Sequence, residues 1–242
     1  MTGSKLLEID NVSRHFGGLK AVDGVSLQVK TGEIVAVIGP NGACKTTLFN
    51  LLTGHLPPSA GDIRLDGKSL AGRRPEQRSR EGLGRTFQIV RPFGSLSVVE
   101  NVMVAAFRRG RSRSQVVDAA HSVLKRTALD HVAYKSAKEL SLGQRKRLEM
   151  ARALATDPRL LLLDETMAGL NPAEVDQVIP LIQRLQKEGV TVVLIEHNLK
   201  VVRTLAERVL VLDHGVPISE GAPHDVLNDP KVIEAYLGAR TR

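Results

Sequence analysis

The sequence predicts an α/β fold with a mainly parallel central sheet, an antiparallel β subdomain and an inserted α-helical subdomain. Three observations lead to this class. Unbroken apolar runs at 34–38 and 160–163 are typical of strands buried on both faces of a parallel sheet. Residues 6–12 and 25–29 alternate apolar and polar side chains, as antiparallel strands with one solvated face do. Between the two apolar runs, residues 100–155 are mostly helical in their periodicity.

The first apolar run leads into a glycine-rich turn and then a helix that begins near Lys45 and ends before Gly54. The amides and the positive dipole end of this helix therefore point into the turn and form an anion site. The turn follows the G-x-x-x-x-G-K-[ST] pattern except at one position, which predicts a P-loop NTPase core. Lys45 is expected to bridge the outer phosphates, and the Thr46 hydroxyl to bind Mg²⁺. The predicted ATP-binding residues of the turn are Gly39, Pro40, Asn41, Gly42, Ala43, Cys44, Lys45, Thr46 and Thr47.

Cys44 stands where that pattern has glycine. Glycine there lets the backbone approach the β-phosphate, in a conformation that a side chain resists. A strained non-glycine residue costs on the order of 1–3 kcal/mol, roughly ten- to hundredfold in affinity. We therefore expect ATP binding that Cys44 weakens, and a thiol that ATP protects from alkylation. The alternative is an inert small residue in a shifted loop.

The second apolar run ends in two carboxylates, Asp164 and Glu165. At the end of a buried strand, the first carboxylate can enter the coordination shell of Mg²⁺. The second would face the water that attacks the γ-phosphate, so Glu165 is predicted to be the catalytic base.

The remaining elements follow in order. A short strand is expected at 63–65, helices at 100–106, 114–128 and 144–155, parallel strands beginning at Thr191 and Arg208, a tight turn at 213–215 and a terminal helix opening at Ala222. The chain then forms one nucleotide-binding domain, residues 1–242. Its catalytic core covers approximately 1–87 and 158–242, and its helical subdomain approximately 88–157. A flexible stretch is expected at 108–114.

Composition predicts a cytoplasmic subunit. No apolar run approaches the roughly 18 residues of a membrane span, and residues 1–5 lack the apolar core of a signal peptide. The net charge of +8 comes with few aromatic residues, so we expect a solvated surface or a face near anionic lipid rather than nucleic-acid binding. Much of the excess charge lies at Arg73, Arg74, Arg78, Arg80, Arg108, Arg109, Arg111 and Arg113.

The run Leu-Ser-Leu-Gly-Gln at 140–144, followed by the basic segment 145–154, resembles the signature motif of ATP-binding-cassette ATPases. Leu142 replaces the first of two glycines, while Ser141 and Gly143 are retained. Other family motifs are matched by Phe16, Gln88, the loop 168–171 and His197, in the family's order. The resemblance covers nearly the whole chain and implies a RecA-like core.

The resemblance also implies roles. Phe16 would stack on adenine, Gln88 would reach the metal and the water, and His197 would contact the γ-phosphate. Two nucleotide-binding subunits would pair head to tail, so that the signature residues of each close the site of the other. Residues 89–93 would form a groove for a helix of a transmembrane permease subunit. The signature residues expected to contact ATP are Ser141, Gly143 and Gln144.

Segments 84–88, 168–172, 195–198 and 228–238 look like the ATPase subunits of branched-chain or hydrophobic amino-acid importers. Such a subunit would lie on the cytoplasmic face of the inner or plasma membrane, in a homo- or heterodimer, and would not contact the amino acid. Urea importers and lipopolysaccharide exporters are alternatives. A soluble cassette ATPase of DNA repair or translation would need insertions or tandem cassettes that this chain lacks. A non-hydrolysing binding module is a further alternative, favoured only by Cys44.

Overall fold

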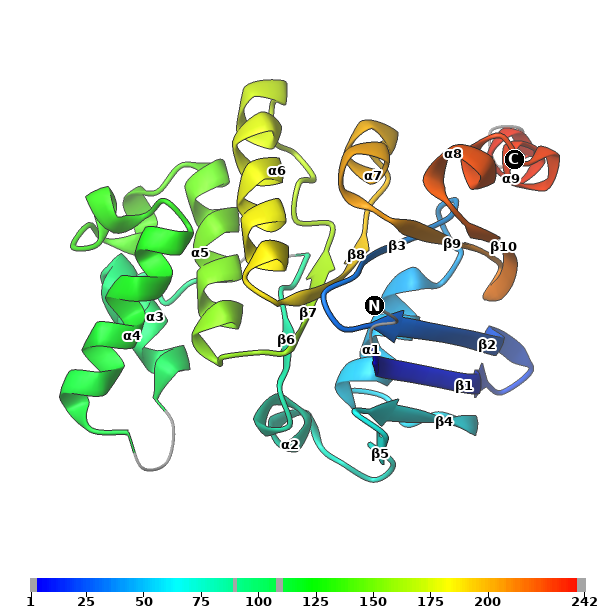
Figure 1. Cartoon of the computed structure of the whole chain (residues 1–242), viewed down its shortest axis with the longest axis horizontal. Helices are drawn as coiled ribbons and strands as arrows, with labels where there is room; N and C mark the ends of the chain where they lie inside the picture. Colours follow the sequence, from blue (N-terminus) through cyan, green and yellow to red (C-terminus); the bar gives the residue numbers. More distant parts are fainter. Residues whose placement is uncertain (1–3, 89–90, 108–110, 239–242) are drawn as a thin grey trace.

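The computed structural model describes residues 4–88, 91–107 and 111–238. Figure 1 shows two sheets packed on each other, with a group of helices to one side. The described residues form one sheet of four strands and one of six. This arrangement confirms the predicted class, an α/β core with an antiparallel β subdomain and an inserted helical lobe.

The smaller sheet is antiparallel, with the strand order β2-β1-β4-β5. Its strands are β1 (Lys5–Phe16), β2 (Leu19–Lys30), β4 (Ala60–Leu65) and β5 (Lys68–Ser69). The alternating pattern of β2 places its apolar residues in the interior and its polar residues in solvent. The predicted antiparallel strands at 6–12 and 25–29 correspond to β1 and β2, and both observed strands are longer than predicted.

The main sheet has the order β10-β9-β3-β8-β7-β6. Its strands are β3 (Ile34–Ile38), β6 (Leu83–Arg85), β7 (Leu160–Asp164), β8 (Thr191–Ile195), β9 (Arg208–Asp213) and β10 (Val216–Gly221). All neighbours pair in parallel except the β9–β10 hairpin, whose turn the sequence predicted. The carboxyl ends of β3, β7 and β8 therefore meet at one edge, the place where such sheets bind ligands.

The main sheet separates two hydrophobic clusters. Val35 of β3 and Leu162 of β7 pack with α1 (Lys45–Thr53) and the antiparallel sheet. Ala36 and Leu161 belong to the other cluster, with helices on the opposite face. Those helices include α6 (Pro172–Lys187) and α7 (Leu199–Leu205), which Figure 1 shows above the sheet. Burial on both faces explains the uninterrupted apolar runs.

The helical lobe consists mainly of α3 (Val98–Ala106), α4 (Arg113–Arg126) and α5 (Leu142–Ala155). These helices confirm the three predicted ones within about two residues at each end. The expected flexible stretch is only partly testable, because residues 108–110 lie outside the described part. Ser112 is the N-cap of α4 and accepts a hydrogen bond from the Gln115 amide, so the prediction was wrong at 112–114.

Short helices complete the core: α2 (Pro75–Arg80), α8 (Pro223–Leu227) and α9 (Pro230–Gly238). In the part of the chain that the structure describes, no helix has the length and apolar character required to cross a membrane. The exact limits of the two subdomains, at 87/88 and 157/158, stay a prediction.

Arg78 does not belong to the basic surface that the sequence predicted. Its side chain is 3% exposed, and its guanidinium donates to the carbonyls of Leu51, Leu52 and Leu70 at 2.7, 2.8 and 2.9 Å. Two of these carbonyls lie in the last turn of α1, where a cation complements the helix dipole. Burial lowers the pKa of Arg78 from its ordinary value. Arg78 therefore fixes the end of the phosphate-loop helix and contributes no surface charge.

Candidate active site

The phosphate loop leaves β3 at Gly39, where the backbone has a φ of 151°. A Cβ at this position would lie 2.0 Å from the Leu212 carbonyl oxygen, so no side chain fits. Lys45 folds back over the loop, and its Nζ donates to the carbonyls of Gly39 at 2.8 Å and Pro40 at 3.0 Å. Burial lowers the pKa of Lys45, while the carboxylates of Glu165 and Asp164 oppose the shift. The loop thus presents one buried cation near two acids.

Cys44 has left-handed backbone angles, φ 62° and ψ 26°, directly before the first residue of α1. This is the conformation that favours glycine, as expected from the phosphate-binding pattern. The Sγ atom lies 3.3 Å from the Gly42 carbonyl oxygen and donates to it. The thiol is only partly buried and is therefore open to reagents at the mouth of the loop.

Asp164 ends β7 with a side chain that is 1% exposed. Its Oδ2 accepts from Arg85 Nη2 at 2.8 Å, whereas its Oδ1 is buried and has no hydrogen-bond partner among the described residues. Burial raises the pKa of Asp164, and the Arg85 guanidinium opposes that rise. A buried carboxylate oxygen without a partner is the type of ligand that a hard divalent cation takes. The site therefore fits the predicted magnesium ion.

Glu165, the next residue, gathers two other predicted site residues. Its Oε2 accepts from Gln88 Nε2 at 2.7 Å, and its Oε1 lies 3.8 Å from His197 Nδ1. The three residues follow β6, β7 and β8, three neighbouring strands of the main sheet. Glu165 itself has a φ of 47°, in the left-handed region. Residues far apart in sequence thus form one polar cluster beside the phosphate loop.

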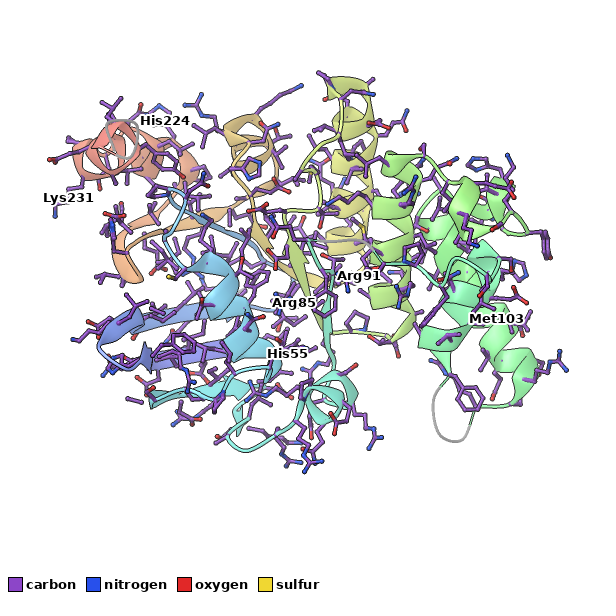
Figure 2. All side chains as sticks on the ribbon, turned by 180° about the vertical axis from the view of Figure 1, so that it is seen from behind. His55, Arg85, Arg91, Met103, His224 and Lys231 are labelled. Atoms are coloured by element: carbon purple, nitrogen blue, oxygen red, sulfur yellow. The ribbon has the colours of Figure 1, made fainter. Side chains whose placement is uncertain are left out.

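A cavity of about 500 Å³ opens beside this cluster. Thr46, Gln88 and Asp164 all line it, so the three predicted magnesium ligands border the same space. Thr46 is an exposed residue at the start of α1. Figure 2 shows Arg85 and Arg91, two further lining residues, near the centre of the molecule between the core and the helical lobe.

The predicted signature residues form the start of α5. Ser141 is its N-cap: Ser141 Oγ accepts from the Gln144 amide at 3.2 Å, and the Ser141 amide donates to Gln144 Oε1 at 3.0 Å. A Cβ at Gly143 would lie 2.8 Å from Oε1 of Glu174, the end of a flexible side chain that could move aside. Within the described residues, no hydrogen bond joins Ser141, Gly143 or Gln144 to the phosphate loop. One protomer therefore does not bring the two predicted halves of the site into contact.

Phe16 lies at the end of β1, and its side chain is 43% exposed. The Arg14 guanidinium lies over the ring, 4.7 Å from the centroid. This cation–π contact orients the ring and leaves it accessible to a flat ligand. Sequence reasoning missed Arg14, because its role depends on the contact between its guanidinium and the Phe16 ring.

Sequence reasoning missed three buried ionisable residues around the cluster. Arg85 pairs with Asp164, Lys146 donates to the carbonyls of Gln88 and Glu165, and Glu196 accepts from the Met167 amide at 3.1 Å. Burial raises the pKa of Glu196 to about 7. Glu196 precedes His197 at the end of an apolar strand, a position that could have drawn attention to it. Lys146 lies in a basic segment that looks solvated in the sequence, and Arg85 is a single arginine whose pairing with Asp164 depends on the tertiary structure.

Comparison with known proteins agrees with this geometry. The family model described as "ABC transporter" matches residues 22–168, and one described as "Branched-chain amino acid ATP-binding cassette transporter" matches residues 216–241. The chain is 42% identical to the high-affinity branched-chain amino acid transport ATP-binding protein BraF of Pseudomonas aeruginosa, over 96% of this chain and 98% of BraF. It is 40% identical to LivG of Escherichia coli K12, a protein of the same description, with the same coverage.

Solved structures show the same fold. The ADP conformation of MJ1267, an ATP-binding cassette of an ABC transporter, superposes with a TM-score of 0.89 at 33% identity, over 97% of this chain and 99% of that one. The dimeric bacterial ABC transporter cassette MJ0796 gives a TM-score of 0.81 at 27% identity, over 90% and 99%. A phosphate loop, a strand-end acid pair and a capped signature helix thus occur together in a chain that these families match along most of its length. The chain belongs to the ATP-binding-cassette ATPases of ABC transporters.

Proposed function

We propose that this chain hydrolyses ATP to power an importer of branched-chain amino acids, with Glu165 as the general base. The observation that carries the catalytic part is the cluster of Gln88, Glu165 and His197 beside the partnerless oxygen of Asp164. The amino-acid part rests on what BraF and LivG are described as doing, and on the match at residues 216–241.

Lys45 is ready to bind phosphate. Its Nζ already lies within the loop, held by two backbone carbonyls. When ATP enters, the ammonium exchanges these neutral acceptors for charged phosphate oxygens, which are stronger partners. The free amides at the start of α1 supply further donors to the same phosphates. The predicted contact of adenine with Phe16 would place the base at the exposed end of β1.

Magnesium would be held by Thr46, Asp164 and Gln88, which border one cavity. When bound, the ion neutralises charge that develops on the β- and γ-phosphates. Arg85 keeps Oδ2 of Asp164 engaged, so that Oδ1 is the oxygen directed to the cation.

Glu165 can then accept a proton from the attacking water as the water oxygen bonds to the γ-phosphorus. The bond from phosphorus to the bridging oxygen breaks, and ADP leaves with that electron pair. Gln88 orients the carboxylate through the 2.7 Å hydrogen bond, and His197 approaches from the other side to contact the γ-phosphate. General base catalysis of this type contributes about 10²–10⁴-fold in rate.

A second protomer would complete the site. Ser141 caps the start of α5, and the first backbone amides of a helix form a site type that binds anions. Head-to-tail pairing would bring the start of α5 to the γ-phosphate of the ATP bound by the other protomer. MJ0796, a cassette of the same fold that is described as dimeric, supports the pairing of two cassettes, while the head-to-tail arrangement is part of the proposal.

The membrane subunits would dock at the junction of core and helical lobe, on the cytoplasmic face. A cavity of about 220 Å³ lies there, lined by His55 and Phe87 on the core side and by Ala105 and Arg152 on the lobe. Residues 89 and 90 of the predicted groove lie outside the described part. A side chain of a permease helix seated in this cavity would contact both subdomains.

Glu165→Gln tests the catalytic proposal. The amide keeps the shape of the side chain but cannot accept a proton, so we expect ATP to bind normally, turnover to fall at least 10²-fold, and an ATP-bound dimer to accumulate in gel filtration. Turnover at the parent rate would exclude Glu165 as the base. The substrate is tested separately, by branched-chain amino-acid uptake in vesicles that contain the assembled transporter, with urea as the competing candidate.

One observation favours a second candidate, a nucleotide-binding subunit impaired by Cys44. The residue occupies a left-handed conformation in which its side chain is strained. If the parent chain lacks turnover and Cys44→Gly restores it, this second reading is correct.

A further inference from the structure

Lys146 is a buried lysine in α5 that the catalytic scheme does not use. It is 5% exposed, and its Nζ donates to the backbone carbonyls of Gln88 and Glu165, both at 3.2 Å. Burial lowers its pKa, while nearby carboxylates, Glu196 first among them, oppose the shift. A lysine buried this deeply needs a reason, because an ammonium is costly to desolvate.

These contacts close a ring around the catalytic pair. Gln88 and Glu165 are joined by their side chains at 2.7 Å, and their backbone carbonyls are joined through Lys146. The ring fixes each residue at two points. Rotation of either backbone would therefore move the carboxylate relative to the amide that orients it.

Glu165 needs such support because its backbone is strained. A φ of 47° is uncommon for a residue with a side chain, and it persists only where the surroundings hold it. The Glu165 amide donates to the Ile195 carbonyl at 3.0 Å, and Lys146 holds the Glu165 carbonyl. One of these two restraints comes from the core and the other from the helical lobe.

The same face of α5 holds the rest of the segment around Gln88. Glu149 and Arg152 follow Lys146 at intervals of three residues and form an ion pair at 3.0 Å. Arg152 Nη1 donates to the Arg91 carbonyl at 3.1 Å, and the guanidinium lies 5.0 Å from the centroid of the Phe93 ring. Figure 2 shows Arg91 beside the lobe. Thus α5 holds the segment around Gln88 at several points, and among the contacts of the described residues Lys146 is the α5 side chain that also reaches Glu165.

We propose that Lys146 is a positioning residue that couples the place of α5 to the geometry of the Gln88–Glu165 pair. A shift of α5 relative to the core would displace the Glu165 carbonyl through its hydrogen bond to Lys146. The direction in which the Glu165 carboxylate points would then change. The inference rests on the proposed role of Glu165 as base. In this proposal the Lys146 side chain links the helical lobe, which carries the signature helix, to the carboxylate that would activate the attacking water.

The test compares Lys146→Met with Lys146→Arg and with Lys125→Met. Methionine keeps the length and removes the donors, arginine keeps charged donors, and Lys125 is an exposed lysine of the same lobe. For Lys146→Met we expect kcat for ATP hydrolysis to fall about 10- to 100-fold with KM changed less than threefold, since small misplacement of a catalytic group has effects of this size. Lys146→Arg should recover to within about threefold of the parent, and Lys125→Met should match the parent.

A second measurement needs no turnover. Hydrogen exchange of the nucleotide-free chain should quicken in Lys146→Met at residues 86–88 and 165–168, with α1 unchanged. Equal kcat in Lys146→Met and the parent, no rescue by arginine, or exchange that quickens throughout the chain would each overturn the inference. Glu165→Gln measured in parallel separates the two proposals: if it is inactive while Lys146→Met is fully active, only the role of Lys146 fails.

Discussion

Gln88 Nε2 donates to Glu165 Oε2 across 2.7 Å, between residues 77 positions apart in the chain. Gln88 lies where the core passes into the helical lobe, and Glu165 lies where the chain has returned to the core. The whole lobe is therefore inserted between the two partners of one hydrogen bond. Any motion of the lobe acts on the segments that hold both.

Replacing Cys44 with glycine should strengthen nucleotide binding. Glycine removes the Cβ and sulfur that hinder the approach of the loop backbone to the β-phosphate, so the Kd for Mg-ATP should fall roughly ten- to hundredfold. Calorimetric titration of parent and Cys44→Gly measures this directly. A Kd within twofold of the parent would mean that the loop accommodates cysteine without strain. Labelling of the parent thiol with an alkylating reagent, with and without Mg-ATP, tests separately whether ATP protects it.

Removing Arg85 should destabilise the protein by leaving a buried carboxylate alone. The pair with Asp164 is almost fully buried, with side-chain exposures of 5% and 1%. Arg85→Met should therefore cost about 3–5 kcal/mol in urea unfolding, and the double variant with Asp164→Asn should regain much of it. Equal stability of the single and double variants would show that Asp164 does not depend on this partner.

Glu196 should make stability depend on pH. Its pKa is about 7 in the fold against 4.5 ordinarily, so between these values the folded protein holds a proton that the unfolded chain has released. The contribution of this group is fully present below pH 4.5 and is lost as pH rises through about 7, a change on the order of 3 kcal/mol. Urea unfolding at pH 5 and pH 8 should show this loss in the parent but not in Glu196→Gln. Identical pH dependence in both proteins would contradict the burial of a charge here.

Replacing Arg78 should loosen the end of α1. Its guanidinium donates to three buried carbonyls, and each bond to a charged donor contributes about 1.5–3 kcal/mol. Arg78→Met should lower the free energy of unfolding by at least about 2 kcal/mol. Arg80→Met, at an exposed position of the same helix, is the matched control and should change it by less than about 0.5 kcal/mol. Equal effects of the two variants on the free energy of unfolding would contradict a structural role for buried Arg78.

Most of the fold could be predicted from the sequence because strands that are buried on both faces have uninterrupted apolar runs. The runs of β3 and β7 and the alternation of β2 were sufficient for the two sheets. The edge strand β6 escaped because it is three residues long and contains Gly84, which the contact with Pro158 requires. At the site, the spacing of the phosphate-loop pattern predicted Lys45, and the end of an apolar strand predicted Asp164 and Glu165. Lys146 and Arg78 were missed because an arginine or lysine in a basic segment looks solvated until tertiary structure encloses it.

The leucines of β7 alternate between two interiors. Leu160 and Leu162 pack toward the antiparallel sheet, while Leu161 and Leu163 pack toward the lobe and α6. The strand that ends in Asp164 therefore contributes side chains to both hydrophobic clusters and separates them. Sequence drift among relatives could change the lobe side to suit a different membrane partner while the nucleotide side stays as it is.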